Sequence, residues 1–131
     1  MAGFIVKPAA TAAFESPGSL APGARGMTRW HAVGETTGAV HSDFGVTRLE
    51  PGGSTAAHVH SVEESFHILS GEVVLVTPEA TVHLRAGDYG VIPIAVPHSW
   101  RAVGTTTAEW SDLFTPPPRA RTGMAAAKTM S

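Results

Sequence analysis

The sequence predicts an all-β sandwich or barrel, and three observations lead to this fold class. The 14 glycines and 10 prolines interrupt the chain roughly every eight to twelve residues, the spacing expected for short strands. The intervals between them are rich in Val, Ile, Thr and Phe, which favour strands. No segment shows helical periodicity of any length. At 131 residues the chain has room for one hydrophobic core, so one pocket is expected.

The expected strands follow from runs of β-forming residues between these breaks. They are Phe4 to Val6, Met27 to Val33, Ala39 to Leu49, Ser54 to His60, Ser65 to Ser70, Glu72 to Thr77, Thr81 to Leu84, Tyr89 to Ile92, His98 to Val103 and Thr105 to Phe114. The chain is therefore divided into N-terminal strands and an arm (1–38), a barrel core (39–114) and a flexible, Pro-containing C-terminal tail (115–131).

Three glycine-containing segments are expected to reverse the chain. They are Glu50-Pro51-Gly52-Gly53, Ser70-Gly71-Glu72 and Arg85-Ala86-Gly87-Asp88. Glycine adopts the positive φ angles that many tight turns require.

The composition excludes several classes of function. Only 15% of the residues are charged, the net charge is −2, and no Lys/Arg cluster lies in the body of the chain, so neither nucleic acid nor a membrane surface is an expected partner. With no cysteine, disulfides, thiolate nucleophiles and Cys-based zinc sites are excluded. No apolar segment has signal-peptide or membrane-spanning length. We therefore expect a cytoplasmic protein.

The segment from Gly52 to Gly71 contains the residues with the clearest chemistry. His58 and His60 are two residues apart, so on a strand both imidazoles point to the same face. Glu64 follows four residues later and reaches the same point if Ser61 to Glu63 form a tight reversal. Glu63 could exchange roles with Glu64, but strand parity favours Glu64 as the inward residue.

A fourth candidate ligand, His98, follows Pro97 where the chain returns across the barrel. Three imidazoles and one carboxylate suit iron, manganese, nickel, zinc, cobalt or copper better than calcium or magnesium. We therefore expect one divalent transition metal per chain, bound by His58, His60, Glu64 and His98. An octahedral ion would keep two positions for water, oxygen or substrate.

These spacings resemble the two motifs of the cupin superfamily. Its first motif is matched by Gly52, His58, His60, Glu64 and Gly71, and its second by Gly87, Asp88, Pro93 and His98. The resemblance covers about residues 44–103 and is to small single-domain members. Two positions depart from the pattern: Ala95 stands where the family has Gly, and Ala102 where it has Asn. Neither is a metal ligand, so these departures concern turn geometry and substrate contacts.

The resemblance implies a double-stranded β-helix, which is a jelly-roll barrel, and a homodimer. In such dimers the N-terminal strands are often exchanged between partners, and Phe4 to Val6 is the segment of this sequence that could be exchanged.

Several other residues are candidates for the pocket. By alternation Phe66 follows Glu64 into the barrel, whereas His67 faces away. Trp100 shares the face of His98 and could line the pocket mouth, although a core position is the simpler interpretation. Tyr89 could place a hydroxyl near the metal as a catalytic group. Arg48 could bind a substrate carboxylate, with a solvated outer position as the alternative.

The expected function is that of a metal-dependent enzyme acting on a small organic molecule, with an oxygenase slightly preferred. The first alternative is a non-redox lyase, isomerase or hydrolase in which the metal acts as a Lewis acid. In either case Glu64 could leave the metal and act as a catalytic base. The second alternative is a small-molecule-binding or sensor protein without turnover, since one barrel serves many functions.

Overall fold

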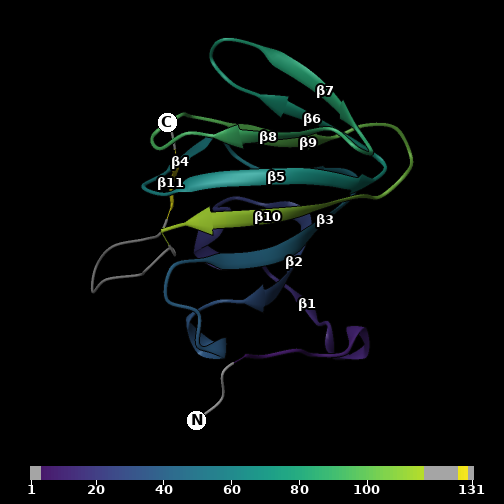
Figure 1. Ribbon diagram of the computed structural model, residues 1–131. Coiled ribbons are helices and arrows are strands. Elements are labelled where there is room, and N and C mark those ends of the chain that lie inside the picture. Colours follow the sequence, from purple (N-terminus) through teal and green to yellow (C-terminus); the bar gives the residue numbers. More distant parts are fainter. Residues whose placement is uncertain (1–3, 117–126, 130–131) are drawn as a thin grey trace.

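The computed structural model of the protein describes residues 4–116 and 127–129, and its regular structure consists mainly of strands (Figure 1). The strands are β1 (Phe14–Glu15), β2 (Arg25–Val33), β3 (Asp43–Ser54), β4 (His58–His60), β5 (Glu63–Ser70), β6 (Glu72–Val76), β7 (Thr81–Arg85), β8 (Tyr89–Ile92), β9 (Ser99–Ala102), β10 (Ala108–Thr115) and β11 (Ala127–Thr129). There are three single-turn 3₁₀ helices in the described residues: η1 (Ala9–Thr11) precedes β1, η2 (Gly18–Leu20) lies between β1 and β2, and η3 (Glu35–Thr37) lies between β2 and β3.

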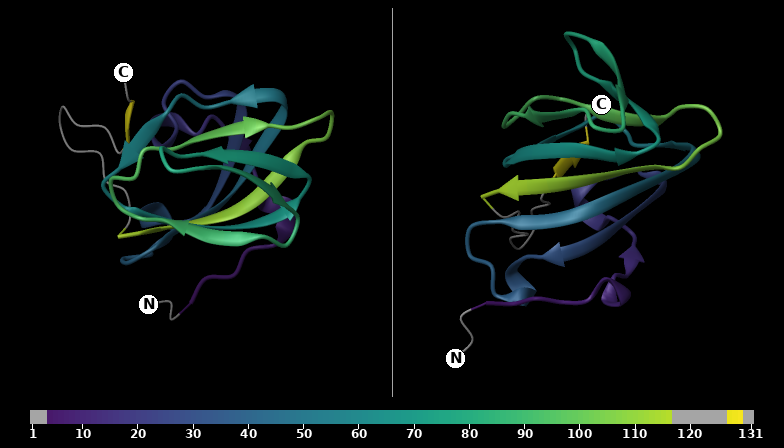
Figure 2. Two further views of the ribbon diagram at one scale, coloured as in Figure 1. Left: turned by 90° about the horizontal axis from the view of Figure 1, so that it is seen from above. Right: turned by 45° about the vertical axis from the view of Figure 1, so that its right-hand side comes forward.

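Nine of the strands form one curled antiparallel sheet in the order β7-β6-β9-β3-β10-β5-β8, to which β2 is added through β3 and β1 through β2, while β4 and β11 form a separate pair. Figure 2 shows this sheet wrapped around a central space. Strand β4 pairs with β11 on one side. On its other side, His58 of β4 forms an isolated β-bridge with His98. The all-β jelly-roll prediction is confirmed.

Side chains along the strands point alternately into and out of the barrel, and the inward side chains fill its interior. Along β10, every second residue from Ala108 to Phe114 is buried, and the residues between them are partly exposed. The buried set changes in character along the strand, from Ala108 and Trp110 to Asp112 and then Phe114. Strand β10 lies between β3 and β5. The inward side chains near its beginning therefore face an apolar part of the interior, and Asp112 lies in a more polar part.

The apolar part of the interior forms a continuous core. Its fully buried members include Leu49, Ile68, Val73 and Ala108. Trp100 and Trp110 stack at a centroid distance of 4.6 Å and belong to this core. Both tryptophans also line the polar cavity described below, so they separate the core from the functional site.

Three predicted elements in the first half of the chain differ from the structure. The expected strand Ser54 to His60 is divided, because Ser54 ends β3 and only His58–His60 forms β4. Phe4 to Val6 is not a strand: it pairs with no strand among the residues that the structure describes, and Phe4 is 82% exposed. Its exchange between two copies stays a prediction. The segment Glu50 to Gly53 does not reverse the chain: it lies within β3 as an irregular insertion, since Arg25 and Met27 of β2 pair with Ser54 and Leu49.

The expected limits of the barrel core, residues 39 and 114, also differ from the structure. Strand β2 pairs directly with β3, so the main sheet includes residues before 39. Within the expected flexible tail, Ala127–Thr129 forms β11 and pairs with β4. The remaining tail residues 117–126 and 130–131 lie outside the described residues.

Candidate metal centre

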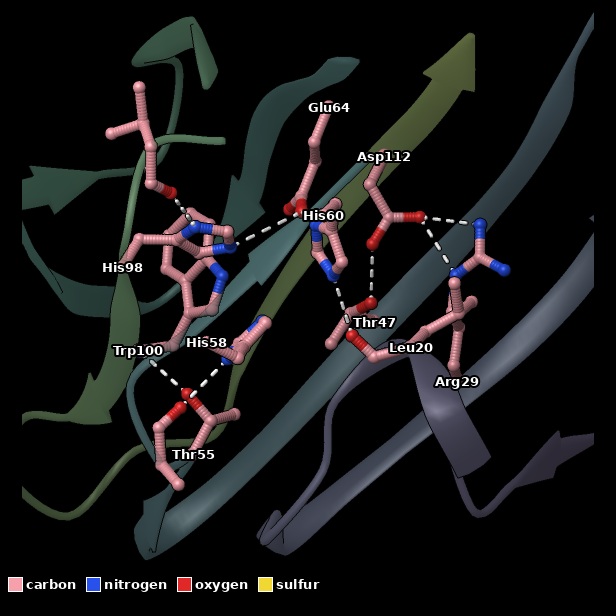
Figure 3. Close-up of polar contacts among 12 residues, drawn as sticks. Leu20, Arg29, Thr47, Thr55, His58, His60, Glu64, His98, Trp100 and Asp112 are labelled. Carbon is pink, nitrogen blue, oxygen red and sulfur yellow. Dashed lines mark hydrogen bonds and ion pairs between the residues drawn. The ribbon is translucent and has the colours of Figure 1, made fainter. Parts of the chain in front are cut away.

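Three parts of the fold bring four potential ligands together inside the barrel (Figure 3). Strand β4 supplies His58 and His60, β5 supplies Glu64, and the segment before β9 supplies His98. Their exposed fractions are only 1% to 5%. The alternation expected on β5 is confirmed, because Glu64 is buried while its neighbour Glu63 is exposed.

The donor atoms of these residues converge. One nitrogen from each of His58, His60 and His98 lies within 4.8 Å of the other two. The Glu64 Oε1 atom lies 3.4 Å from His60 Nδ1 and 3.6 Å from His98 Nε2. Three imidazole nitrogens therefore face a common point, and the Glu64 carboxylate lies beside two of them.

Backbone carbonyl groups fix which ring nitrogen of each histidine faces this point. The Nδ1 atom of His58 lies 2.7 Å from the Ala56 carbonyl oxygen, and the Nδ1 atom of His98 lies 2.9 Å from that of Val96. These contacts assign the proton to Nδ1 in both rings, so Nε2 is unprotonated and its lone pair is free to bind a metal.

The third ring has the opposite arrangement. His60 Nε2 lies 2.7 Å from the carbonyl oxygen of Leu20 in η2, so Nδ1 is its free donor atom. Such outer contacts hold imidazoles in the orientation and tautomer that a metal requires.

Two of the free nitrogens, His60 Nδ1 and His98 Nε2, are buried and have no hydrogen-bond partner among the described residues. Buried polar atoms without partners are rare in folded proteins and call for an explanation. Both atoms face the carboxylate of Glu64 at ion-pair distance. A divalent cation would satisfy all of these atoms together, so the residues fit a metal with mixed nitrogen and oxygen ligands.

The electrostatics of the four residues also favour cation binding. Burial lowers the pKa of His58 to about 4, which keeps this ring neutral at pH 7. Burial opposes ionisation of Glu64, but His60 and His98 beside it outweigh this effect and lower its pKa to about 2. Burial likewise opposes the charge on His60, but the adjacent Glu64 carboxylate gives a net raised pKa. A metal would replace the proton of His60.

A narrow cavity of about 20 Å³ adjoins the centre, which is room for about one water molecule. Its polar lining beyond the ligands consists of Arg29, Thr47 and Asp112. The Asp112 carboxylate accepts hydrogen bonds from Arg29 Nε at 2.9 Å and from the Thr47 hydroxyl at 2.5 Å. Pro17, Leu20 and Ala21, in and beside η2, line the same cavity.

Sequence reasoning missed Arg29, Thr47 and Asp112. The alternation of side chains along β10 could have indicated Asp112. It lies on the same face as Trp110 and Phe114, where an apolar residue would be expected. A carboxylate on a buried face requires a partner, and Arg29 on the same sheet supplies it.

The other candidate residues lie in different environments. Trp100 lines the cavity and also belongs to the apolar core. Phe66 contacts Trp100 edge-to-face at a ring distance of 5.3 Å and belongs to the same core, outside the cavity lining. Tyr89 is 82% exposed and pairs with His67, so its hydroxyl does not reach the centre. Arg48 does not line the cavity: its Nε contacts Glu109 at 2.7 Å and its guanidinium lies over Phe14, which agrees with the outer position.

Solved structures of other proteins share the fold of this chain. A polyketide cyclase, RemF from Streptomyces resistomycificus, superposes with a TM-score of 0.82 at 21% identity, covering 98% of this chain and 86% of the other. A predicted oxalate decarboxylase from Thermotoga maritima gives 0.73 at 25% identity, covering 86% of this chain and 99% of the other. A sugar phosphate isomerase from Silicibacter pomeroyi gives 0.63 at 23% identity, covering 71% and 61%.

No curated protein sequence matches the chain. In the described residues, no helix is long and apolar enough to cross a membrane. The sequence model of the cupin domain matches residues 45–114, the segment that contains strands β4 to β9 and all four candidate ligands. The chain therefore belongs to the cupin family.

Proposed function

We propose that the protein is a metal-dependent enzyme that moves a proton on a small organic molecule next to a carbonyl group, without oxidation. The observation that supports this proposal is that two buried carboxylates, Glu64 and Asp112, line the same cavity but contact different partners. Glu64 faces His60 and His98, whereas Asp112 contacts Arg29 and Thr47. Carboxylates in contrasting environments are typical of sites that separate the roles of ligand and base.

His58, His60, Glu64 and His98 would hold the cation. A divalent ion at this position would act as a Lewis acid that polarises a substrate carbonyl. The four side chains contribute one negative charge through Glu64 and three neutral rings once the proton of His60 has been displaced. They would leave the ion with a net positive charge toward the substrate.

Asp112 is better suited than Glu64 to accept the proton. Burial raises the pKa of the Asp112 carboxyl, and Arg29 offsets this effect only in part. The low pKa of Glu64, about 2, makes its carboxylate a weak base. A base works best when its pKa lies near the working pH. The Asp112 carboxylate would take a proton from the carbon beside the carbonyl and return it at another atom, with Arg29 and Thr47 holding it in place.

The similar structures include proteins named as a cyclase, a decarboxylase and an isomerase. Their likeness supports the fold, and their names are compatible with non-redox chemistry in such a barrel. The slight preference for an oxygenase from the sequence stays a prediction, and the test below separates it from the proposal.

The test follows exchange of carbon-bound protons for deuterium. Protein loaded with zinc and kept under nitrogen is incubated in D₂O with small ketones, beginning with 2-butanone, and the protons beside the carbonyl are followed by ¹H NMR. The proposal expects metal-dependent exchange that Asp112→Asn lowers by about 100-fold or more, with metal content unchanged. Asp43→Asn is the matched control, because Asp43 also pairs with Arg29 but does not line the cavity.

Other results would contradict the proposal. Turnover that requires iron and consumes dioxygen would identify an oxygenase. Ketone binding without exchange under any metal would identify a binding protein. Equal exchange by the Asp112 and Asp43 variants would remove Asp112 as the base.

A further inference from the structure

Residues 16–24, which connect β1 to β2 and include η2, form part of the wall of the cavity beside the metal centre. We call this segment the strap. Three of its residues, Pro17, Leu20 and Ala21, line the cavity. All other residues of the lining lie in strands β2, β3, β4, β5, β9 and β10. The strap is therefore the one part of the described cavity wall that is not held in a β-ladder.

The cavity is too small for an organic ligand while the strap is in place. Its volume of about 20 Å³ is room for about one water molecule. The side chains of the histidine cluster and Glu64 are also only 1% to 5% exposed. A molecule of even a few heavy atoms can therefore reach the cluster only if part of the cavity wall moves.

The strap is the part of the wall with the fewest contacts to hold it. None of its residues is buried. Its backbone hydrogen bonds among the described residues are internal and long: the N–H groups of Leu20, Ala21 and Ala24 donate to carbonyl groups within the strap at 3.2–3.4 Å. Segments with few buried contacts and few long-range hydrogen bonds open locally, whereas moving a strand would break the sheet. The strap is therefore the part of the wall that moves.

Two Pro-Gly pairs lie on either side of the middle of the strap. They are Pro17-Gly18 and Pro22-Gly23. Both glycines have positive φ angles, of 60° and 72°, and a Cβ atom at Gly18 would have no neighbour within 4 Å. Glycine changes between positive and negative φ at little cost, and a few such positions are enough to act as hinges. The segment between the two pairs, which contains Leu20, can therefore move as a unit.

One hydrogen bond connects the strap to the rest of the described residues. His60 Nε2 donates to the carbonyl oxygen of Leu20 at 2.7 Å. Figure 3 shows the His60 ring between this carbonyl group and the Glu64 carboxylate. An acceptor on one ring nitrogen sets which nitrogen faces a metal. The contact that holds the strap therefore also orients a ligand of the metal centre.

We propose that the strap is a lid on the metal centre, hinged at its two Pro-Gly pairs and held closed by the hydrogen bond between His60 and the Leu20 carbonyl group. Opening breaks this hydrogen bond and withdraws the Leu20 side chain from the cavity, which makes room for a ligand. Closing restores the orientation of His60 and excludes water. The role of the lid in admitting a substrate rests on the proposed function, whereas its opening does not.

The test makes use of the absence of cysteine from the chain. A thiol introduced at a buried position reacts with iodoacetamide only when the protein opens at that position. Met27→Cys places a thiol in the cavity lining, and Leu84→Cys places one in the core outside it. Both native side chains are 8% exposed. In the full chain, Met27→Cys should react about 100-fold or more faster, because the strap opens far more often than the barrel unfolds.

The urea dependence of these rates shows which kind of opening exposes each thiol. Opening of the strap exposes little surface, so the rate for Met27→Cys should change by less than about twofold per molar urea. The rate for Leu84→Cys should rise by about tenfold or more per molar, because it requires unfolding of the barrel. If Met27→Cys does not fold, Thr47→Cys takes its place, since Thr47 is 4% exposed and lines the same cavity.

Two phenylalanine substitutions test the hydrogen bond, each combined with Met27→Cys and measured in the presence of EDTA. His60→Phe keeps a ring in place but removes the donor to Leu20, so the thiol should react about three- to tenfold faster. His58→Phe is the matched control. His58 is also buried and lies in β4, but its Nδ1 atom contacts Ala56 rather than the strap, so the rate should change by less than about twofold.

Equal reactivity of Met27→Cys and Leu84→Cys, with the same urea dependence, would overturn the lid. Equal rates for His60→Phe and His58→Phe would show that the Leu20 carbonyl group does not hold it closed. If either phenylalanine variant does not fold, the comparison of the two thiols still decides whether the strap opens. Deuterium exchange is measured separately, so local opening without exchange would retain the lid and remove the enzyme. Exchange without local opening would do the reverse.

Discussion

The Oε1 atom of Glu64 lies 3.4 Å from Nδ1 of His60, with both side chains almost completely buried. This distance is longer than the 2.7–2.9 Å typical of a charge-assisted hydrogen bond. The two atoms therefore face each other without a well-formed hydrogen bond, as is expected of two ligands that share a cation. The histidine cluster and the glycine positions of the two motifs lead to four predictions.

Removal of one histidine of the cluster should abolish metal binding while the barrel still folds. His58→Ala and His98→Ala should each lower metal affinity by more than about 100-fold, since even changes behind the ligands cost about 10- to 100-fold. The fold should persist because much of its apolar core, including Leu49, Ile68 and Val73, does not line the cavity beside the cluster. Elemental analysis of the purified variants, with circular dichroism as the check on folding, measures both effects.

The control for this prediction is His67→Ala. His67 is exposed and lies on β5, three residues from Glu64, so its removal should leave metal content unchanged. Full metal content in both cluster variants would contradict the assignment of the ligands.

The two glycines of the first motif should differ in their tolerance of alanine. Gly52 and Gly71 both have positive φ angles, of 80° and 73°, so alanine costs about 1–2 kcal/mol at either site. A Cβ atom at Gly71 would also lie 2.4 Å from the carbonyl oxygen of Thr107, whereas Gly52 has open space around it. Gly71→Ala should therefore lower the free energy of unfolding by about 1–3 kcal/mol more than Gly52→Ala. Urea denaturation of both variants tests this, and equal losses would contradict it.

Ala95→Gly should stabilise the protein. Ala95 has a φ of 65° and is the one non-glycine residue with positive φ in the described part of the chain. Glycine would remove about 1–2 kcal/mol of strain and lose about 0.5–1 kcal/mol through its more flexible unfolded chain. The net gain of roughly 0.5–1 kcal/mol should raise Tm by a few degrees. An unchanged or lower Tm in calorimetry would show that this turn tolerates alanine without strain.

The metal-free protein should lose stability from His58 as the pH falls from 6.5 to 4. The pKa of His58 is about 4 in the folded protein and about 6.5 in an unfolded chain. Between these values the unfolded chain binds a proton that the folded protein does not, so lowering the pH favours unfolding by roughly 3 kcal/mol. Above pH 6.5 the stabilising contribution is complete.

His60 responds in the opposite sense, because its raised pKa gives stability that is lost as the pH rises through the folded value. The contribution of His58 is therefore isolated by comparing wild type with His58→Asn in urea at several pH values, with EDTA present. The difference in unfolding free energy between the two proteins should narrow by roughly 3 kcal/mol from pH 6.5 to pH 4. A constant difference would contradict the lowered pKa.

Much of the fold could be predicted from local sequence. Strand β8 (Tyr89–Ile92) has the predicted bounds, and β5, β6 and β7 differ from prediction by at most two residues at either end, because each is a short β-forming run between glycine or proline breaks. The segment Glu50 to Gly53 was interpreted wrongly. Its Pro-Gly-Gly sequence is equally compatible with a turn and with an irregular insertion in a strand, and only pairing with β2 distinguishes them.

The sequence by itself determined the candidate ligands, because the two-residue period of a strand places His58 and His60 on one face and the motif spacing adds Glu64 and His98. Only the tertiary structure decided the rest of the cavity. Arg29, Thr47 and Asp112 are 18 to 83 residues apart along the chain, and they meet because β2, β3 and β10 are neighbours in the sheet. Tyr89 and Arg48 were plausible candidates by position, but their side chains lie outside the cavity. Local periodicity fixes the face of a strand on which a residue lies, whereas long-range pairing fixes which residues share a cavity.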